Sequence, residues 1–97
     1  MPTKYYIYII KCKNGSYYIG HTNDLKRRMK DHQAGYGSKF TTDNQTDAPL
    51  YFEEFNSRSE AMKRETQLKK WSKAKKKALI ESDLEKLHEL SKRKLGL

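Results

Sequence analysis

The sequence predicts a small α+β domain in which a three-stranded antiparallel or mixed sheet is flanked by helices, in the order β-β-α-β-α-α-α. A length of 97 residues suits a single domain over residues 1–97, with a core from 4 to 80. Three short segments are rich in aromatic and β-branched residues and are bounded by turn signals, which is typical of strands. Capping signals mark the helix starts.

The first two strands, over residues 4–12 and 16–20, form a predicted hairpin around Lys13-Asn14-Gly15. A two-residue turn would place Tyr8 and Tyr18 on opposite faces of the sheet. A three-residue turn with Gly15 in the left-handed conformation pairs Ile10 with Tyr18, and both tyrosines then share one face. The third strand is expected over residues 50–55, after a long polar loop over 36–48.

Each predicted helix follows a residue type that commonly caps helix N-termini. In two cases the capping serine precedes a glutamate by three positions, which forms a capping box. The four helices are expected over residues 24–34, 58–71, 73–80 and about 83–94, with caps at Thr22 or Asn23, Ser57, Ser72 and Ser82.

The net charge is +9, from 21 Lys and Arg against 12 Asp and Glu. Most of the excess lies between Lys63 and Lys77. Such a surface attracts phosphate backbones, although a solvated helical face or attraction to anionic lipid explains the charge as well.

Several functional classes are excluded by composition. The sequence has no apolar run near the roughly 20 residues of a membrane span, and no secretory signal, so no membrane partner is expected. A single cysteine, Cys12, rules out an internal disulfide framework and favours a cytoplasmic protein.

Tyr6-Ile7-Tyr8 is followed ten residues later by Tyr18-Ile19-Gly20, and this pair of motifs resembles that of the GIY-YIG nuclease superfamily. Arg28, His32 one turn later, and Glu65 on the helix after the third strand match the family order. The chain is most similar to the small stand-alone bacterial GIY-YIG proteins, over about residues 4–80.

The resemblance implies metal-dependent hydrolysis of nucleic-acid phosphodiesters. Glu65 would bind Mg²⁺ or Mn²⁺, Arg28 would hold the scissile phosphate, and Tyr18 would be the general base with support from Tyr8. His32 would orient a water or donate to the phosphate, or would be a half-exposed structural residue. His21 matches a position that can carry a second proton-transfer group. A shared site requires both tyrosines on one face, so the three-residue turn is predicted.

Glu65 also has a physical argument of its own. It falls on the helical stripe of Ala61 and Leu68 and not on the solvated face. A buried carboxylate needs a partner. Mg²⁺ commonly takes one or two carboxylates, and a salt bridge to a neighbouring Lys or Arg is the alternative.

The expected function is an endonuclease acting on DNA, including branched, single-stranded or damaged DNA, with repair or recombination suggested by family analogy. RNA remains open as a substrate, and a protein partner could supply target choice. Two positions depart from the family pattern. Tyr6 replaces a Gly, which leaves the Tyr8 position intact, and no Asn follows Asn56, which favours the alternative of a catalytically weak or inactive nucleic-acid-binding adaptor. The residues expected to contact nucleic acid are Lys39, Lys63, Arg64, Lys69, Lys70, Lys73, Lys76 and Lys77.

Overall fold

The computed structural model describes residues 3–12, 14–33 and 49–82 of the chain. The element order in these ranges is β-β-α-β-α-α, which confirms the predicted α+β class. The predicted helix over about 83–94 and the loop over 36–48 lie outside the described residues. The elements are β1 (Tyr5–Lys11), β2 (Tyr17–Thr22), α1 (Leu25–Gln33), β3 (Tyr51–Phe55), α2 (Arg58–Lys69) and α3 (Lys73–Ile80).

The three strands form one sheet in the order β2-β1-β3, so β1 is central and β2 lies at an edge. Both pairings are antiparallel, which decides between the antiparallel and mixed sheets that the sequence allowed. The hairpin has the predicted register, because Ile10 pairs with Tyr18. Gly15 has a φ of 87°, the left-handed conformation that the three-residue turn requires.

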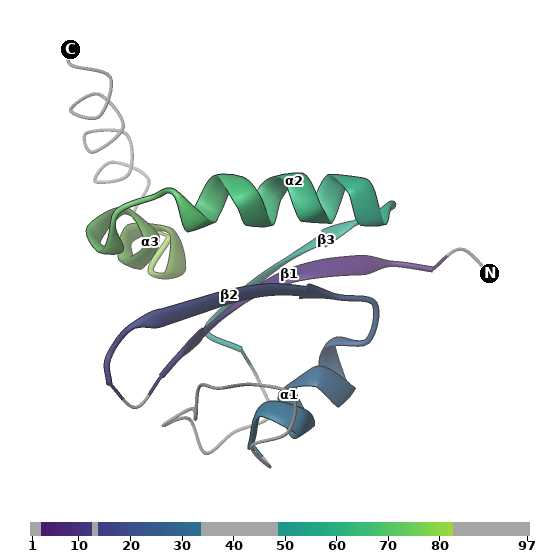
Figure 1. The fold of residues 1–97 in the computed structure, drawn as a ribbon, viewed down its shortest axis with the longest axis horizontal. Helices are drawn as coiled ribbons and strands as arrows, with labels where there is room; N and C mark the ends of the chain where they lie inside the picture. The colour runs from purple at the N-terminus through teal and green to yellow at the C-terminus, as the bar shows by residue number, and fades with distance from the viewer. Residues whose placement is uncertain (1–2, 13, 34–48, 83–97) are drawn as a thin grey trace.

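Helices cover both faces of the sheet, with α2 and α3 on one side and α1 on the other (Figure 1). On the α2 side, a fully apolar cluster contains Ile7, Ile9, Ile19, Ala61 and Leu68. The α1 side holds a second cluster, made of Tyr8, Ile10 and Met29 with Tyr18 and Leu25 packed against it. The alternation of side chains along a strand thus separates two cores.

Helix caps follow the sequence with one correction. The Ser57 and Ser72 hydroxyls accept hydrogen bonds from backbone N–H groups three residues later, as predicted. The prediction of Thr22 or Asn23 as the first cap was wrong, because the Asp24 carboxylate accepts from the backbone N–H of Arg27. Thr22 is still part of β2, which moves the helix start along the chain. In the described ranges, no helix is long and apolar enough to cross a membrane.

Candidate active site

The Tyr8 hydroxyl lies directly over the backbone of Gly20, its cross-strand partner. A Cβ atom at position 20 would lie 2.6 Å from the hydroxyl oxygen of Tyr8 and 2.8 Å from its Cζ. The Tyr18 ring packs beside them, with its centroid 6.2 Å from that of Tyr8. The glycine therefore leaves the space that the Tyr8 ring fills.

His32 reaches the same position from α1. Its Nε2 lies 2.9 Å from the Tyr8 hydroxyl oxygen, and its ring centroid lies 5.3 Å from that of Tyr18. His32 is 3% exposed and Tyr8 is 2% exposed, so neither side chain is open to solvent. The alternative that His32 is a half-exposed structural residue was wrong, because the side chain is buried.

Burial and neighbouring charges keep this pair neutral. Burial raises the pKa of the Tyr8 hydroxyl, Tyr18 raises it further, and Arg28 opposes the rise. Burial also lowers the pKa of the His32 imidazole, and Arg28 lowers it further. The Tyr8 hydroxyl and His32 Nε2 share one hydrogen bond, and which of them donates depends on whether Nε2 or Nδ1 of the imidazole carries the proton. Within the described residues, that Nδ1 has no hydrogen-bond partner.

Glu65 projects from α2, and both of its carboxylate oxygens are engaged. His21 Nδ1 lies 2.8 Å from Oε1, and Lys69 Nζ lies 3.1 Å from Oε2. The Glu65 side chain is 16% exposed, whereas that of Lys69 is 56% exposed. The salt bridge considered from the sequence is present, and its lysine sits on the solvent side.

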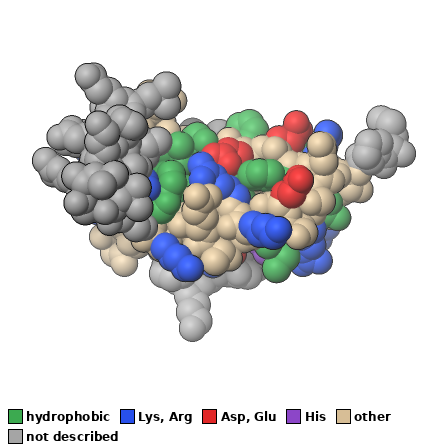
Figure 2. All heavy atoms as spheres, turned by 90° about the horizontal axis from the view of Figure 1, so that it is seen from above, with side chains coloured by type: hydrophobic (Ala, Val, Ile, Leu, Met, Phe, Trp, Pro, Cys, Tyr) green, Lys and Arg blue, Asp and Glu red, His purple; other side chains and the backbone are tan. Residues whose placement is uncertain are grey.

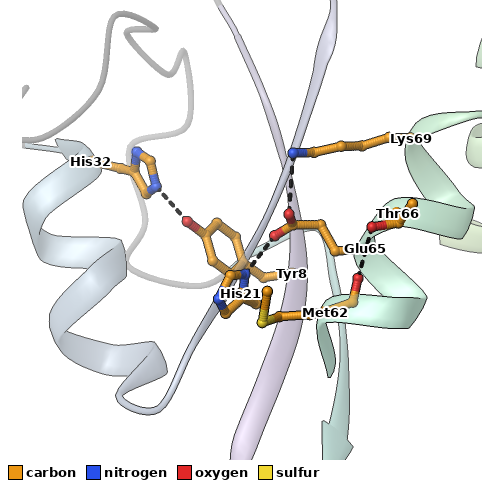
Figure 3. Close-up of polar contacts among 7 residues, drawn as sticks. All are labelled: Tyr8, His21, His32, Met62, Glu65, Thr66 and Lys69. Carbon is orange, nitrogen blue, oxygen red and sulfur yellow. Dashed lines mark hydrogen bonds and ion pairs between the residues drawn. The ribbon is translucent and has the colours of Figure 1, made fainter. Parts of the chain in front are cut away.

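The Tyr8–His32 pair and the His21–Glu65 pair both lie near the β2 edge of the sheet. Figure 3 shows Tyr8 between the helix that carries His32 and the helix that carries Glu65. Glu65 is close enough to contribute to the raised pKa of Tyr8, and Arg28 is close enough to affect both Tyr8 and His32. The structure therefore gathers all six residues expected at the active site: Tyr8, Tyr18, His21, Arg28, His32 and Glu65.

The donor set indicates what kind of metal ion the site suits. Within the described ranges, no group of three or more His, Cys, Asp or Glu could enclose a metal ion. Glu65 supplies one carboxylate, and His21 holds it in place. This set fits Mg²⁺ or Mn²⁺, which can keep several water ligands and share a substrate phosphate, and does not fit a fully enclosed ion.

The basic residues expected to contact nucleic acid do not form one uniform patch. Arg64 donates two hydrogen bonds to Glu53, 2.9 and 3.0 Å long, and its guanidinium lies 5.2 Å from the centre of the Trp71 ring. Lys73 Nζ lies 5.9 Å from the Tyr17 ring centre. Figure 2 shows basic side chains dispersed among hydrophobic and acidic ones on the α2 side. Lys63, Lys69, Lys70, Lys73 and Lys77 are exposed, Lys76 is half-buried, and Lys39 lies outside the described residues.

One basic residue near the site was not among the sequence predictions. Arg58 lines a hollow together with His21 and Arg28. The signal for it was its position seven residues before Glu65, which places both on one face of α2.

A family model for the GIY-YIG catalytic domain matches residues 4–78. The chain belongs to the GIY-YIG family. A UPF0213 protein of Halobacterium salinarum is 43% identical over 76 residues, covering 78% of this chain and 99% of its own. A UPF0213 protein of Staphylococcus saprophyticus is 44% identical over 77 residues, covering 79% and 94%. The solution NMR structure of the UPF0213 protein BH0048 from Bacillus halodurans has a TM-score of 0.51 at 38% identity, covering 80% of this chain and 83% of that one.

Proposed function

We propose that this GIY-YIG protein is a divalent-metal-dependent endonuclease that hydrolyses phosphodiester bonds in DNA. The observation that carries the proposal is the convergence of the Tyr8–His32 and His21–Glu65 pairs near Arg28. A purely structural cluster has no need for a partly exposed carboxylate, an imidazole and a half-buried guanidinium beside two tyrosines.

Each residue has a distinct role in this proposal. Glu65 would hold Mg²⁺ or Mn²⁺, which when bound offsets the charge that develops on the phosphate. Arg28 grips the scissile phosphate through its planar guanidinium, a geometry that lysine lacks. Tyr18 is half-buried and so reachable by water, and it is assigned to activating the attacking water. Tyr8 is buried and neutral, so it positions Tyr18 and receives its own orientation from His32.

His21 and Lys69 act through Glu65. His21 fixes one carboxylate oxygen from the rigid β2 strand, and can also move a proton at its second ring nitrogen. Lys69 forms an ion pair with the other oxygen through an exposed side chain. Exposed ion pairs contribute little free energy, so a metal cation could replace the lysine easily. The displaced ammonium would then be available to pair with a substrate phosphate.

Cleavage of a DNA panel tests the proposal. Plasmid, single-stranded, flap and junction DNAs would be incubated with Mg²⁺ or Mn²⁺ and with wild type, Glu65→Gln or Glu60→Gln. Loss of the metal ligand is expected to remove several kcal/mol of transition-state stabilisation, so Glu65→Gln should cut at least about a hundredfold more slowly. Glu60→Gln makes the same chemical change at an exposed position on the same helix and should cut like wild type. Equal cutting by all three proteins would refute the proposal.

The alternative is a catalytically inactive nucleic-acid-binding adaptor with the same fold. It is favoured by the engagement of both Glu65 oxygens by side chains and by the lack of an Asn after Asn56. Salt-sensitive binding of DNA or RNA without cutting by any variant would support the adaptor. A role in repair or recombination, and a protein partner that supplies target choice, remain proposals by family analogy.

A further inference from the structure

Arg58 extends the candidate active site along α2. It is the first residue of that helix and precedes Glu65 by seven positions. Seven residues make about two turns, so the two side chains share a helix face and lie roughly 10 Å apart along the axis. Arg58 is exposed, and among residues 3–12, 14–33 and 49–82 it makes no hydrogen bond or ion pair.

Arg58 borders an open hollow, here named the β2 hollow, with a volume of about 370 Å³. This is roughly ten times the volume of one water molecule in the liquid, taken as about 30 Å³. Two arginines, a histidine, two residues with hydroxyl groups and an asparagine line it, and no carboxylate does. The lining residues are Tyr5, His21, Thr22, Asn23, Arg28 and Arg58.

A second hollow shares part of this wall but differs in charge. The α1 hollow also contains Thr22, Asn23 and Arg28, and adds Asp24, Arg27 and Asp31. Its two arginines are matched by two carboxylates, so it has no net attraction for an anion. Behind the β2 hollow, His21 is paired with the carboxylate of Glu65, which also contacts Lys69. Arg58 lines only the β2 hollow, so it adds a positive charge there that no lining carboxylate balances.

We propose that the β2 hollow binds two consecutive phosphates of a nucleic-acid strand, the scissile one at Arg28 and its neighbour at Arg58. This inference rests on the proposed function and deepens it, because it sets the path of the strand from α1 across β2 to the N-terminal end of α2. The ligand chemistry is a phosphodiester anion, and the source is a strand and not free phosphate.

Binding without metal tests the strand path separately from cleavage. A fluorescein-labelled 12-nucleotide oligothymidylate would be titrated in EDTA at several salt concentrations with wild type, Arg58→Met, Arg58→Lys and Arg27→Met. Arg27→Met is the matched control, since it removes one arginine from the α1 hollow. Loss of one phosphate contact should lower the slope of log K against log salt by about 0.7. Arg58→Met should also bind about threefold to tenfold more weakly.

Arg58→Lys keeps the charge and should recover the slope. Arg27→Met should match wild type. Equal losses in Arg58→Met and Arg27→Met would overturn the inference in favour of diffuse surface charge. An unchanged slope in Arg58→Met, with cutting of DNA intact, would overturn the inference and leave the proposed function standing. Failure of wild type to bind this oligonucleotide would overturn the inference, and the cleavage panel would decide the proposed function separately.

Free phosphate is distinguished by NMR of the arginine Nε–H groups. The oligonucleotide should shift the Arg58 and Arg28 signals at micromolar concentration, and inorganic phosphate should do so only at far higher concentration. Equal sensitivity to inorganic phosphate would overturn the assignment to a strand.

Discussion

The sheet face under α2 and the face over α1 are made by alternating residues of the same two strands. On the α2 face, Ile7 and Ile9 are 0% exposed and pack on Leu68 without any buried polar atom among them. On the α1 face, the equally buried Tyr8 carries a hydroxyl that needs His32. The core under α2 is therefore apolar, whereas the core over α1 contains a polar pair, and the polar pair of the α2 side, His21 and Glu65, lies outside the apolar cluster.

Residues of the candidate site come from both faces of the sheet near β2. His21 and Glu65 meet on the α2 side, while Tyr8, Tyr18 and His32 lie on the α1 side. Because β2 is an edge strand, groups from both sides can approach one substrate there.

The largest expected effect separates stability from chemistry. Leu68 is 0% exposed in the apolar core, so Leu68→Ala should lower the free energy of unfolding by about 2–5 kcal/mol. The rate of cleavage per folded molecule should stay the same, since no residue proposed for catalysis is altered. Urea unfolding and cleavage assays would measure both quantities. Met62→Ala, on the exposed side of the same helix, is the control and should change stability by less than about 0.5 kcal/mol.

If Leu68→Ala also slowed cleavage per folded molecule, the apolar core under α2 would contribute to catalysis as well as to stability, and the expected separation of the two would be wrong.

A smaller effect on stability, with a larger one on chemistry, is expected on the other face. Gly20→Ala would press a methyl group against the Tyr8 hydroxyl and ring, which His32 and Tyr18 hold in place. Overpacking of this kind costs about 1–3 kcal/mol and should break the Tyr8–His32 hydrogen bond. Cleavage per folded molecule should then fall.

A double-mutant cycle with Tyr8→Ala checks the cause. With the ring removed, adding the alanine at position 20 should cost little further stability, so the two changes should be strongly non-additive. Additive losses would mean that the strain arises elsewhere.

The same alternation explains how much the sequence could predict. Strand spacing reduced the hairpin register to two choices, because the side-chain period of a strand is two. The requirement that Tyr8 and Tyr18 share a site then selected the three-residue turn, and the structure has that register. Helical spacing placed Glu65 on the stripe of Ala61 and Leu68. Both predictions depend on residue spacing within one hairpin or one helix, so no contact between distant segments had to be predicted.

Contacts between elements were harder to predict. The His21–Glu65 pair joins residues 44 positions apart, and no periodicity connects β2 with α2. The burial of His32 depends on how α1 packs against the sheet, which its sequence does not specify. The capping role of Asp24 was missed because three successive residues, Thr22, Asn23 and Asp24, are all good caps, and the length of β2 decides among them.

The smallest expected effect is a pH dependence confined to the α1 face. Because the pKa of His32 is lowered below its usual 6.5 in the folded protein, the unfolded chain binds the proton more readily. Stability should therefore fall as the pH falls below about 6.5, and should level off below the folded pKa. The slope should not exceed about 1.4 kcal/mol per pH unit, the value for one proton.

Urea unfolding between about pH 5 and 7.5 would measure this slope in wild type, in His32→Gln and in His21→Gln. The glutamine at position 32 keeps a partner for the Tyr8 hydroxyl but cannot titrate, so the slope should shrink in that variant alone. A slope that persists in His32→Gln and disappears in His21→Gln would assign the dependence to the α2 face, where the carboxylate of Glu65 lies.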